Sequence, residues 1–273
     1  MIGWNRHGKS RVRLVRIDRG ADAHELHDLT IDVQLEGAFE AVYAGDNSAC
    51  VATDTMKNTV YALARRAPIR HAEAFAIRLA DHFIEKPAVE KVTISATEHP
   101  WDRLDARGRP HPHAFVRAAG DWTALVTRDR RATIVAAGVT NVVLLKTTDS
   151  AFVGFPRDEY TTLPDAGDRV LATSMTASWT YRGRDVDFSS RDRIRAALVE
   201  TFAEHDSRSV QHTLAAMGEA ALQACGDIDT ITLTLPNRHH LLVDLAPFGL
   251  DNPQEVFVAT DQPYGLIEAT IRR

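Results

Sequence analysis

Cysteine is scarce in this sequence of 273 residues, which contains only Cys50 and Cys225. Two thiols so far apart are too few to indicate a disulfide framework or a cage of metal ligands, and they favour a reducing compartment. No His-Glu-x-x-His or Cys-x-x-Cys pattern occurs either. The 12 histidines, including the runs His111-Pro112-His113 and His239-His240, therefore lack the spacing of metal ligands. We expect no metal site.

Long apolar runs and an excess of positive charge are absent as well. No segment approaches the ~20 apolar residues that cross a bilayer, and the N-terminal residues lack the apolar core of a signal peptide. The 32 basic and 37 acidic residues give a net charge of −5, which argues against a nucleic-acid partner. In the one basic run, Arg11 and Arg13 alternate with Val12 and Leu14, as in a half-buried strand. We expect neither membrane nor nucleic acid as a partner.

The hydrophobic and charged fractions, 44% and 25%, are those of an ordinary globular protein. In the first half, spacing of three and four residues predicts helices from Thr55 to Arg66 and from about His71 to Lys86. Thr53 or Asp54 is the expected N-cap of the first helix, and prolines end both. Period-two alternation predicts strands around residues 12–17, 31–35, 92–96, 113–115, 122–125 and 134.

The second half repeats this order of elements. Strands are predicted at residues 142–145 and 171–181, helices through 194–202 and 214–221, and closing strands at 231–235 and 241–245. Each half reads strand–strand–helix–helix–strand–strand, which predicts an α+β fold of antiparallel sheets with paired helices on one face. Ala136-Ala137-Gly138 interrupts the pattern, so we expect two domains, residues 1–137 and 138–273.

Two polar cassettes lie about a hundred residues apart in the chain. The first runs from Asp46 to Leu63 and contains Ala52-Thr53-Asp54; the second runs from Phe152 through Leu163 to Thr173. Both are richer in hydroxyls, amides and paired charges than a core segment needs. Together they resemble the signatures of the urate oxidase (uricase) family, and the resemblance spans nearly the whole chain.

For the fold, the resemblance implies two tandem tunnelling-fold (T-fold) units. Their sheets close into a barrel only by oligomerisation, because a lone half-barrel leaves long open strand edges. We therefore expect a homotetramer. The last residues, Thr270-Ile271-Arg272-Arg273, lack the peroxisomal tripeptide of many eukaryotic members, which favours a cytoplasmic location.

For the activity, the resemblance implies that urate, O2 and water are converted to 5-hydroxyisourate and H2O2 without metal or flavin. A flat anionic purine requires a ring to stack on, a fixed cation and amide groups. By resemblance, Phe152 is the stacking ring and Arg169 the clamp, whose planar guanidinium suits an anionic edge better than lysine. Gln211 supplies the amide beside the backbone of Val210, and Leu163 closes the pocket wall.

The resemblance also implies a proton relay formed by Lys9, Thr53 and His239, with Asn237 lining the site for oxygen and water. In the family, the lysine and threonine come from one subunit and the other residues from its neighbour. Asp54 has two interpretations. It binds substrate through its backbone N–H at a helix N-terminus, or it serves only as the helix cap.

Other interpretations remain at this stage. Phe152 can be a core residue, and Arg169 can form a structural ion pair with Asp158, Glu159 or Asp168. A different T-fold enzyme would act on another purine or a pterin, and such enzymes usually anchor the heterocycle with a glutamate. A non-catalytic purine-binding protein would need the relay to be inert.

Overall fold

The computed structural model describes residues 2–273, apart from the side chain of Asp261. The chain divides into two compact units. The first comprises the residues up to Val139 together with Trp179–Ser190, and the second comprises Thr140–Ser178 and Arg191–Arg273. None of the helices in the described part of the chain combines the length and the hydropathy that a bilayer-crossing segment requires.

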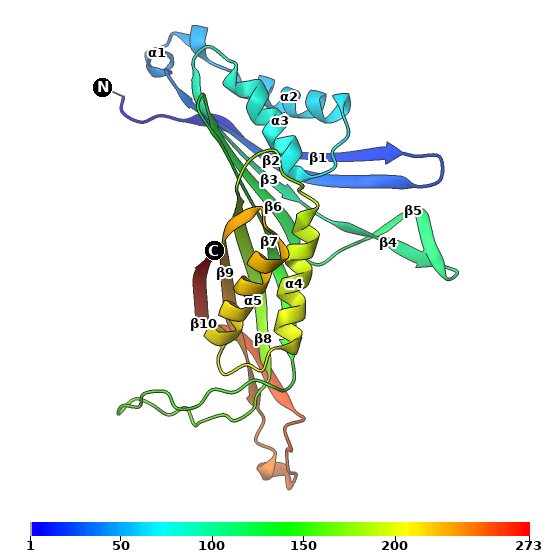
Figure 1. Cartoon of the computed structure of the whole chain (residues 1–273), viewed down its shortest axis with the longest axis vertical. Coiled ribbons are helices and arrows are strands. Elements are labelled where there is room, and N and C mark those ends of the chain that lie inside the picture. The colour runs from blue at the N-terminus through cyan, green and yellow to red at the C-terminus, as the bar shows by residue number, and fades with distance from the viewer. Residues whose placement is uncertain (1) are drawn as a thin grey trace. The chain divides into compact units, whose positions relative to one another are not determined.

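In the first unit, two helices cover one face of an antiparallel sheet (Figure 1). Neighbouring strands follow the order β1-β2-β3-β6-β7, and β4 and β5 form a separate two-stranded sheet. Alternate residues of β2 (Leu29, Ile31, Val33 and Leu35) are fully buried against the helical layer. The elements are β1 (His7–Arg19), β2 (His24–Gly37), α1 (Glu40–Tyr43), η1 (Asn47–Ala49), α2 (Thr53–Arg66), α3 (Ala72–Ile84), β3 (Val89–Glu98), β4 (Trp101–Ala106), β5 (Arg109–Arg117), β6 (Asp121–Asp129) and β7 (Thr133–Lys146).

The second unit has the same plan, with strands in the order β7-β8-β9-β10 and β7 shared with the first unit. Helix α5 contacts β9 and β10. At Gly218 a Cβ atom would lie 2.6 Å from Cδ1 of Ile271, so only glycine lets α5 approach β10 this closely. The elements are β8 (Leu171–Tyr181), α4 (Ser190–Glu204), α5 (Val210–Ala224), β9 (Ile228–Leu242), η2 (Ala246–Phe248) and β10 (Phe257–Arg272).

The predicted α+β class, with antiparallel strands and a pair of helices in each half, is confirmed. The predicted helical faces are confirmed too, because Phe75, Leu79 and Phe83 of α3 are buried, as are Ile194 and Leu198 of α4. The spacing of apolar residues was sufficient to predict these faces, because each helix buries one side along its length.

Three local predictions are wrong. Helix α2 begins at Thr53 and its N-cap position is Ala52, so neither Thr53 nor Asp54 is the cap. Ala136-Ala137-Gly138 does not break a strand, because β7 runs without interruption from Thr133 to Lys146. Small residues suggested a turn there, yet Val135, Ala137 and Val139 keep the strand alternation and are buried.

The third error concerns the last strands. The predicted strands at 231–235 and 241–245 belong largely to the single strand β9, and its partner β10 was not predicted. β10 contains Pro263 and Gly265, which are typical of turns. The register of its pairing with β9 shifts between Thr260 and Gly265, and this irregularity accommodates both residues.

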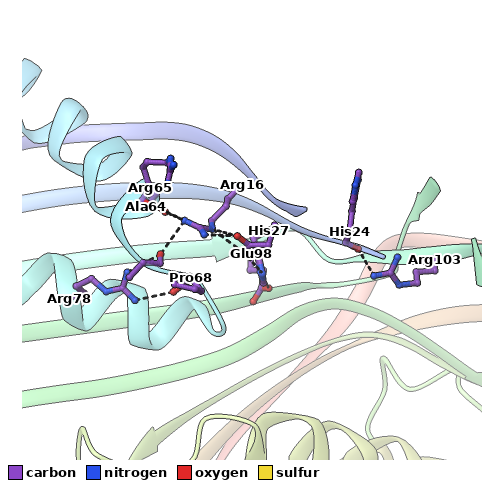
Figure 2. Close-up of polar contacts among 11 residues, drawn as sticks. Arg16, His24, His27, Ala64, Arg65, Pro68, Arg78, Glu98 and Arg103 are labelled. Carbon is purple, nitrogen blue, oxygen red and sulfur yellow. Dashed lines mark hydrogen bonds and ion pairs between the residues drawn. The ribbon is translucent and has the colours of Figure 1, made fainter. Parts of the chain in front are cut away.

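Two arginines from outside α2 close the C-terminal end of that helix (Figure 2). Arg78 of α3 donates from Nη2 to the carbonyl of Pro68 at 3.1 Å, and Arg16 of β1 donates from Nη1 to the carbonyl of Ala64. The last carbonyls of a helix lack partners within it, and cations are favourable there. The two guanidinium groups therefore fix the end of α2 opposite Thr53.

Asp18 in turn holds the side chain of Arg16. Nε of Arg16 donates to the two carboxylate oxygens of Asp18 at 2.9 and 3.0 Å. This hydrogen bonding lowers the pKa of Asp18, against the opposing effect of burial. The carboxylate thus holds the guanidinium of Arg16 in the position from which it reaches the end of α2.

We expect the variant Asp18→Asn to be less stable than the parent protein at neutral pH. A carboxyl group with a lowered folded pKa stabilises the fold above its unfolded pKa of about 3.9, and this contribution is lost as the pH falls through the folded pKa. The difference in melting temperature between the two proteins should therefore shrink below about pH 4. Asp22→Asn, an exposed change in the same hairpin, is the control. A difference that stays constant with pH would contradict the assignment.

Candidate active site

Lys9 lies beside an irregularity in the pairing of β1 with β2. The register shifts between Lys9 and Val12, so that two residues of β1 stand opposite Asp32. Arg11 has a φ of 56°, and its backbone N–H donates to Oδ1 of Asp32 at 2.6 Å. Bulges of this kind re-aim side chains and occur often beside active sites. Lys9 pairs directly with the buried Val33, which puts its side chain on the helix-covered face of the sheet.

His7 joins the start of β1 to the segment that leads into α2. Its Nε2 lies 3.2 Å from the carbonyl oxygen of Val51, and its ring packs edge-on against Phe39 at 4.5 Å. Residues two apart on a strand share a face, so Lys9 points to the same side as His7. Thr53 follows Val51 by two residues. The structure therefore brings Lys9 and the N-terminal turn of α2 together.

Thr53 and Asp54 are exposed in that first turn. The first backbone N–H bonded within the helix is that of Met56, to the carbonyl of Ala52 at 3.1 Å, which leaves the N–H groups of Thr53 and Asp54 outside the helical ladder. The Asp54 carboxylate accepts from Nζ of Lys57 at 2.5 Å; this bond is the main cause of its lowered pKa, and the charge of Lys9 is a lesser one. The N-cap position belongs to Ala52, so Asp54 is not the cap, and its carboxylate is engaged by Lys57.

The second cassette is attached to the residues that precede α5. The backbone N–H of Phe152 donates to the carbonyl of Ala166 at 2.8 Å, and the reciprocal bond measures 3.0 Å. One residue earlier, the N–H of Ala151 donates to the carbonyl of Ser207 at 2.6 Å. Ser207 is fully buried. It therefore ties the long β7–β8 connection (Figure 1) to the start of α5.

Val210 and Gln211 form the first turn of α5. The N-cap is Ser209, whose hydroxyl accepts from the backbone N–H of His212 at 3.1 Å. Val210 is buried, whereas Gln211 is exposed at the same helix end. The cap therefore fixes the direction of the exposed Gln211 amide, four residues after the link at Ser207.

Arg169 lies over the ring of Phe152, with its Cζ 5.2 Å from the ring centre. Burial lowers the pKa of Arg169, and its Nε is buried without a hydrogen-bond partner among the described residues. Within those residues its guanidinium makes no ion pair, so the considered pairing with Asp158, Glu159 or Asp168 is not found. A partly desolvated guanidinium over an aromatic face suits a planar anion.

Asp168 stabilises the conformation of the loop before β8 and, within the described residues, makes no ion pair with the guanidinium of Arg169. Its carboxylate accepts from the hydroxyl of Thr148 at 2.7 Å and from the backbone N–H groups of Ser150 and Arg169 at 3.1 and 3.0 Å. The hydroxyl bond is the main cause of the lowered pKa of Asp168. These bonds fix the backbone that carries Arg169.

Asn237 and His239 lie on β9, opposite Gly265 and Thr260 of β10. They flank the register shift of that pair and are half-buried. Over residues 2–273, no hydrogen bond joins either side chain to Phe152 or Arg169. Leu163, also predicted for the pocket wall, is 52% exposed.

The predicted residues thus form two sets, one in each unit. Lys9, Thr53 and Asp54 belong to the first unit; the second holds Phe152, Leu163, Arg169, Val210, Gln211, Asn237 and His239. Five pockets of about 210 to 750 Å³ are lined by residues of the first unit, and no predicted site residue lines any of them.

Two residues near Phe152, the aromatic Phe155 and the cationic Arg157, were not predicted from the sequence as part of the site. The ring of Phe155 stacks on that of Phe152, with centroids 4.8 Å apart and planes 9° from parallel. Cζ of Arg157 lies 4.9 Å from the centre of the Phe155 ring. The signal in the sequence was a second phenylalanine three residues after the first, with Val153 and the turn-forming Gly154 between them.

A possible set of metal ligands occurs once in the part of the chain that the structure describes. Ligand atoms of Asp18, Glu25 and His27 lie within 4.8 Å of one another. Arg16 already binds the Asp18 carboxylate, and Figure 2 shows His27 beside that guanidinium. The cluster is therefore explained as a polar network around the anchor of α2.

Comparison with known proteins gives a consistent result. The family model described as uricase matches residues 5–123 and 135–268. Uricase of Arthrobacter globiformis is 46% identical over 279 residues, which cover 100% of this chain and 90% of that protein. For uricase of Dictyostelium discoideum the identity is 38% over 276 residues, with 98% and 96% covered. A crystal structure of the Arthrobacter globiformis enzyme superposes with a TM-score of 0.95 at 45% identity, covering 100% of this chain and 95% of that one.

Proposed function

The chain belongs to the uricase family, and from this membership we propose that it converts urate, O2 and water to 5-hydroxyisourate and H2O2. It is accordingly an oxidoreductase that acts on urate with O2 as acceptor, built on the family's tandem T-fold. The net reaction removes two electrons from the purine, which O2 accepts together with two protons. Water supplies the hydroxyl oxygen of the product.

The arrangement of Arg169 over Phe152 is the observation that carries this proposal. Its guanidinium is partly buried and makes no ion pair among the described residues, so its charge is available to a ligand. The urate anion stacks on Phe152, and Arg169 donates to its carbonyl edge. Gln211 and the backbone of Val210 complete the polar contacts, and Leu163 forms a wall.

Proton transfer is assigned to Lys9, Thr53 and His239. Thr53 passes a proton from urate towards Lys9, whose charge acts on Asp54 in the N-terminal turn of α2 and helps to lower the pKa of that carboxyl. The backbone N–H of Asp54, which lies outside the hydrogen-bond ladder of α2, binds the anionic substrate at the helix terminus. Asn237 holds O2 or water near His239. No metal or flavin takes part in this scheme.

The scheme requires two copies of the chain. We assign Lys9 and Thr53 to one subunit and the purine-binding set to its neighbour within a homotetramer. The edge strands β1 and β10 each offer an unpaired side, as judged from residues 2–273. Two loops of the second unit also expose large apolar side chains, with Tyr160 at 83% and Phe248 at 74%. Exposed apolar surface and free strand edges favour association.

Two further assignments complete the proposal. The tandem repeats divide near residue 137, into 1–137 and 138–273. The protein works in the cytoplasm, which agrees with the free thiols of Cys50 and Cys225.

Loss of urate absorbance in purified, chelator-treated protein tests the activity, with O2 and H2O2 followed in parallel. We expect urate and O2 to fall together while H2O2 rises. If urate persists but raises the melting temperature of the protein, the protein binds purines without oxidising them. That result would overturn the oxidase assignment. Absence of both turnover and binding would overturn the proposed site as well.

The relay is tested by Lys9→Met and Thr53→Val. Each should lower kcat by about 10²- to 10⁴-fold, because general acid–base groups contribute on that scale. Affinity for xanthine, an oxopurine used as a urate analogue, should change little, since these residues act on proton transfer. Titration of xanthine beside steady-state kinetics separates the two effects. Equal losses of turnover and affinity would remove the residues from the relay.

The clamp is tested by Arg169→Lys, which keeps the charge and loses the planar fork of donors. We expect KM for urate and the dissociation constant for xanthine to rise about tenfold or more. Arg193→Gln, which removes an exposed charge of the same unit, is the matched control and should leave both unchanged. An unaltered affinity in Arg169→Lys would take this residue out of the site.

A further inference from the structure

Four side chains of the second cassette form one continuous stack. Arg169 lies 5.2 Å from the centre of the Phe152 ring, the Phe152 and Phe155 rings are 4.8 Å apart, and Arg157 lies 4.9 Å from the Phe155 ring. The order is therefore cation, ring, ring, cation. Such contacts are attractive both between offset parallel rings and between a guanidinium and a ring face.

The backbone holds the Phe155 end of this stack firmly. Gly154 has a φ of 73°, which turns the chain so that Phe155 folds back over Phe152. The N–H of Gly154 donates to Oδ1 of Asp165 at 3.2 Å. Arg157 reaches the same oxygen from Nη2 at 3.3 Å. One carboxylate thus fixes both the turn and the cation that covers Phe155.

The Arg169 end is held differently. Its backbone is fixed by Asp168, but its guanidinium makes no ion pair within the described residues, and its Nε has no hydrogen-bond partner there. Phe155 stacks on one face of the Phe152 ring, which leaves the other face for the guanidinium of Arg169, 5.2 Å from the ring centre. A purine that stacks on Phe152 has to take one of these two places. Arg169 is the neighbour with fewer restraints.

We propose that Phe155 and Arg157 are positioning residues that back the stacking ring, whereas Arg169 covers its opposite face until urate replaces it. This inference rests on the proposed function, in which Phe152 carries the purine. On binding, the guanidinium moves from the ring face to the edge of the purine. Phe155 keeps the plane of Phe152 fixed, so the purine meets an oriented platform.

Phe155→Ala tests the inference beside Phe155→Tyr, which retains the ring. We expect KM for urate to rise about three- to tenfold in Phe155→Ala, with kcat changed less than about twofold, because the lost ring–ring contact acts on binding. Phe155→Tyr should restore KM. Arg157→Gln should raise KM in the same direction. Val153→Ala, an exposed change in the same turn, is the matched control and should leave KM unchanged.

Three outcomes would overturn the inference. A fall of KM in Phe155→Ala would mean that Phe155 occupies the purine's own place. An unchanged KM would mean that the stack does not act on binding. An equal rise of KM in Val153→Ala would mean that the effect of Phe155→Ala reflects only the stability of the loop. Titration of the same variants with xanthine, with melting temperatures recorded, distinguishes this failure from that of the proposed function. If the parent protein binds xanthine but does not oxidise urate, the proposed oxidase activity is wrong. The affinities of the variants for xanthine then still test the role of the stack.

Discussion

Burial of one face of the main antiparallel sheet beneath a pair of helices in each unit is the constraint on which the rest of the structure depends. The fully buried Ile31 and Val33 of β2 and Met56 of α2 belong to the resulting core. Because helices protect only one face, every strand must alternate apolar and polar residues. The same constraint leaves the edge strands β1 and β10 with unpaired sides among the described residues, so the fold itself invites association.

The candidate functional residues lie where these regular elements are interrupted or end. Lys9 precedes a bulge in β1, Thr53 and Gln211 lie in first turns of helices, and Phe152 and Arg169 lie in the connection before β8. Regular structure uses up backbone hydrogen bonds and apolar faces, whereas bulges and helix N-termini leave donors free for a ligand. Remote anchors such as Arg16 and Arg78 are therefore part of the site's architecture, because they hold α2 by its other end.

Sequence patterns predicted the helices well and the strand ends poorly. A helix with one buried stripe, such as α3 with Phe75 and Leu79, is readable from local spacing alone. The continuity of β7 through Gly138 and the whole of β10 were missed, because a strand is defined by partners distant in sequence. The site roles remain proposals. Their residue types were readable from the two cassettes, but the contacts of Phe152 with Phe155 and Arg169 were not.

By itself the sequence determined the fold class, the helical faces and the family, since each depends on apolar spacing or on residues that stay together along the chain. Only the tertiary structure decided that Thr53 lies inside α2, that Arg169 lacks an ion pair among the described residues, and that Phe155 covers one face of Phe152. The physical reason is that the sequence places carboxylates such as Asp158 and Asp168 near Arg169, and each could have formed an ion pair with it. The Asp168 carboxylate accepts from the backbone N–H of Arg169, and the Asp158 carboxylate accepts from the hydroxyl of Thr161. Both carboxylates are therefore engaged elsewhere, which leaves the guanidinium of Arg169 for the ring.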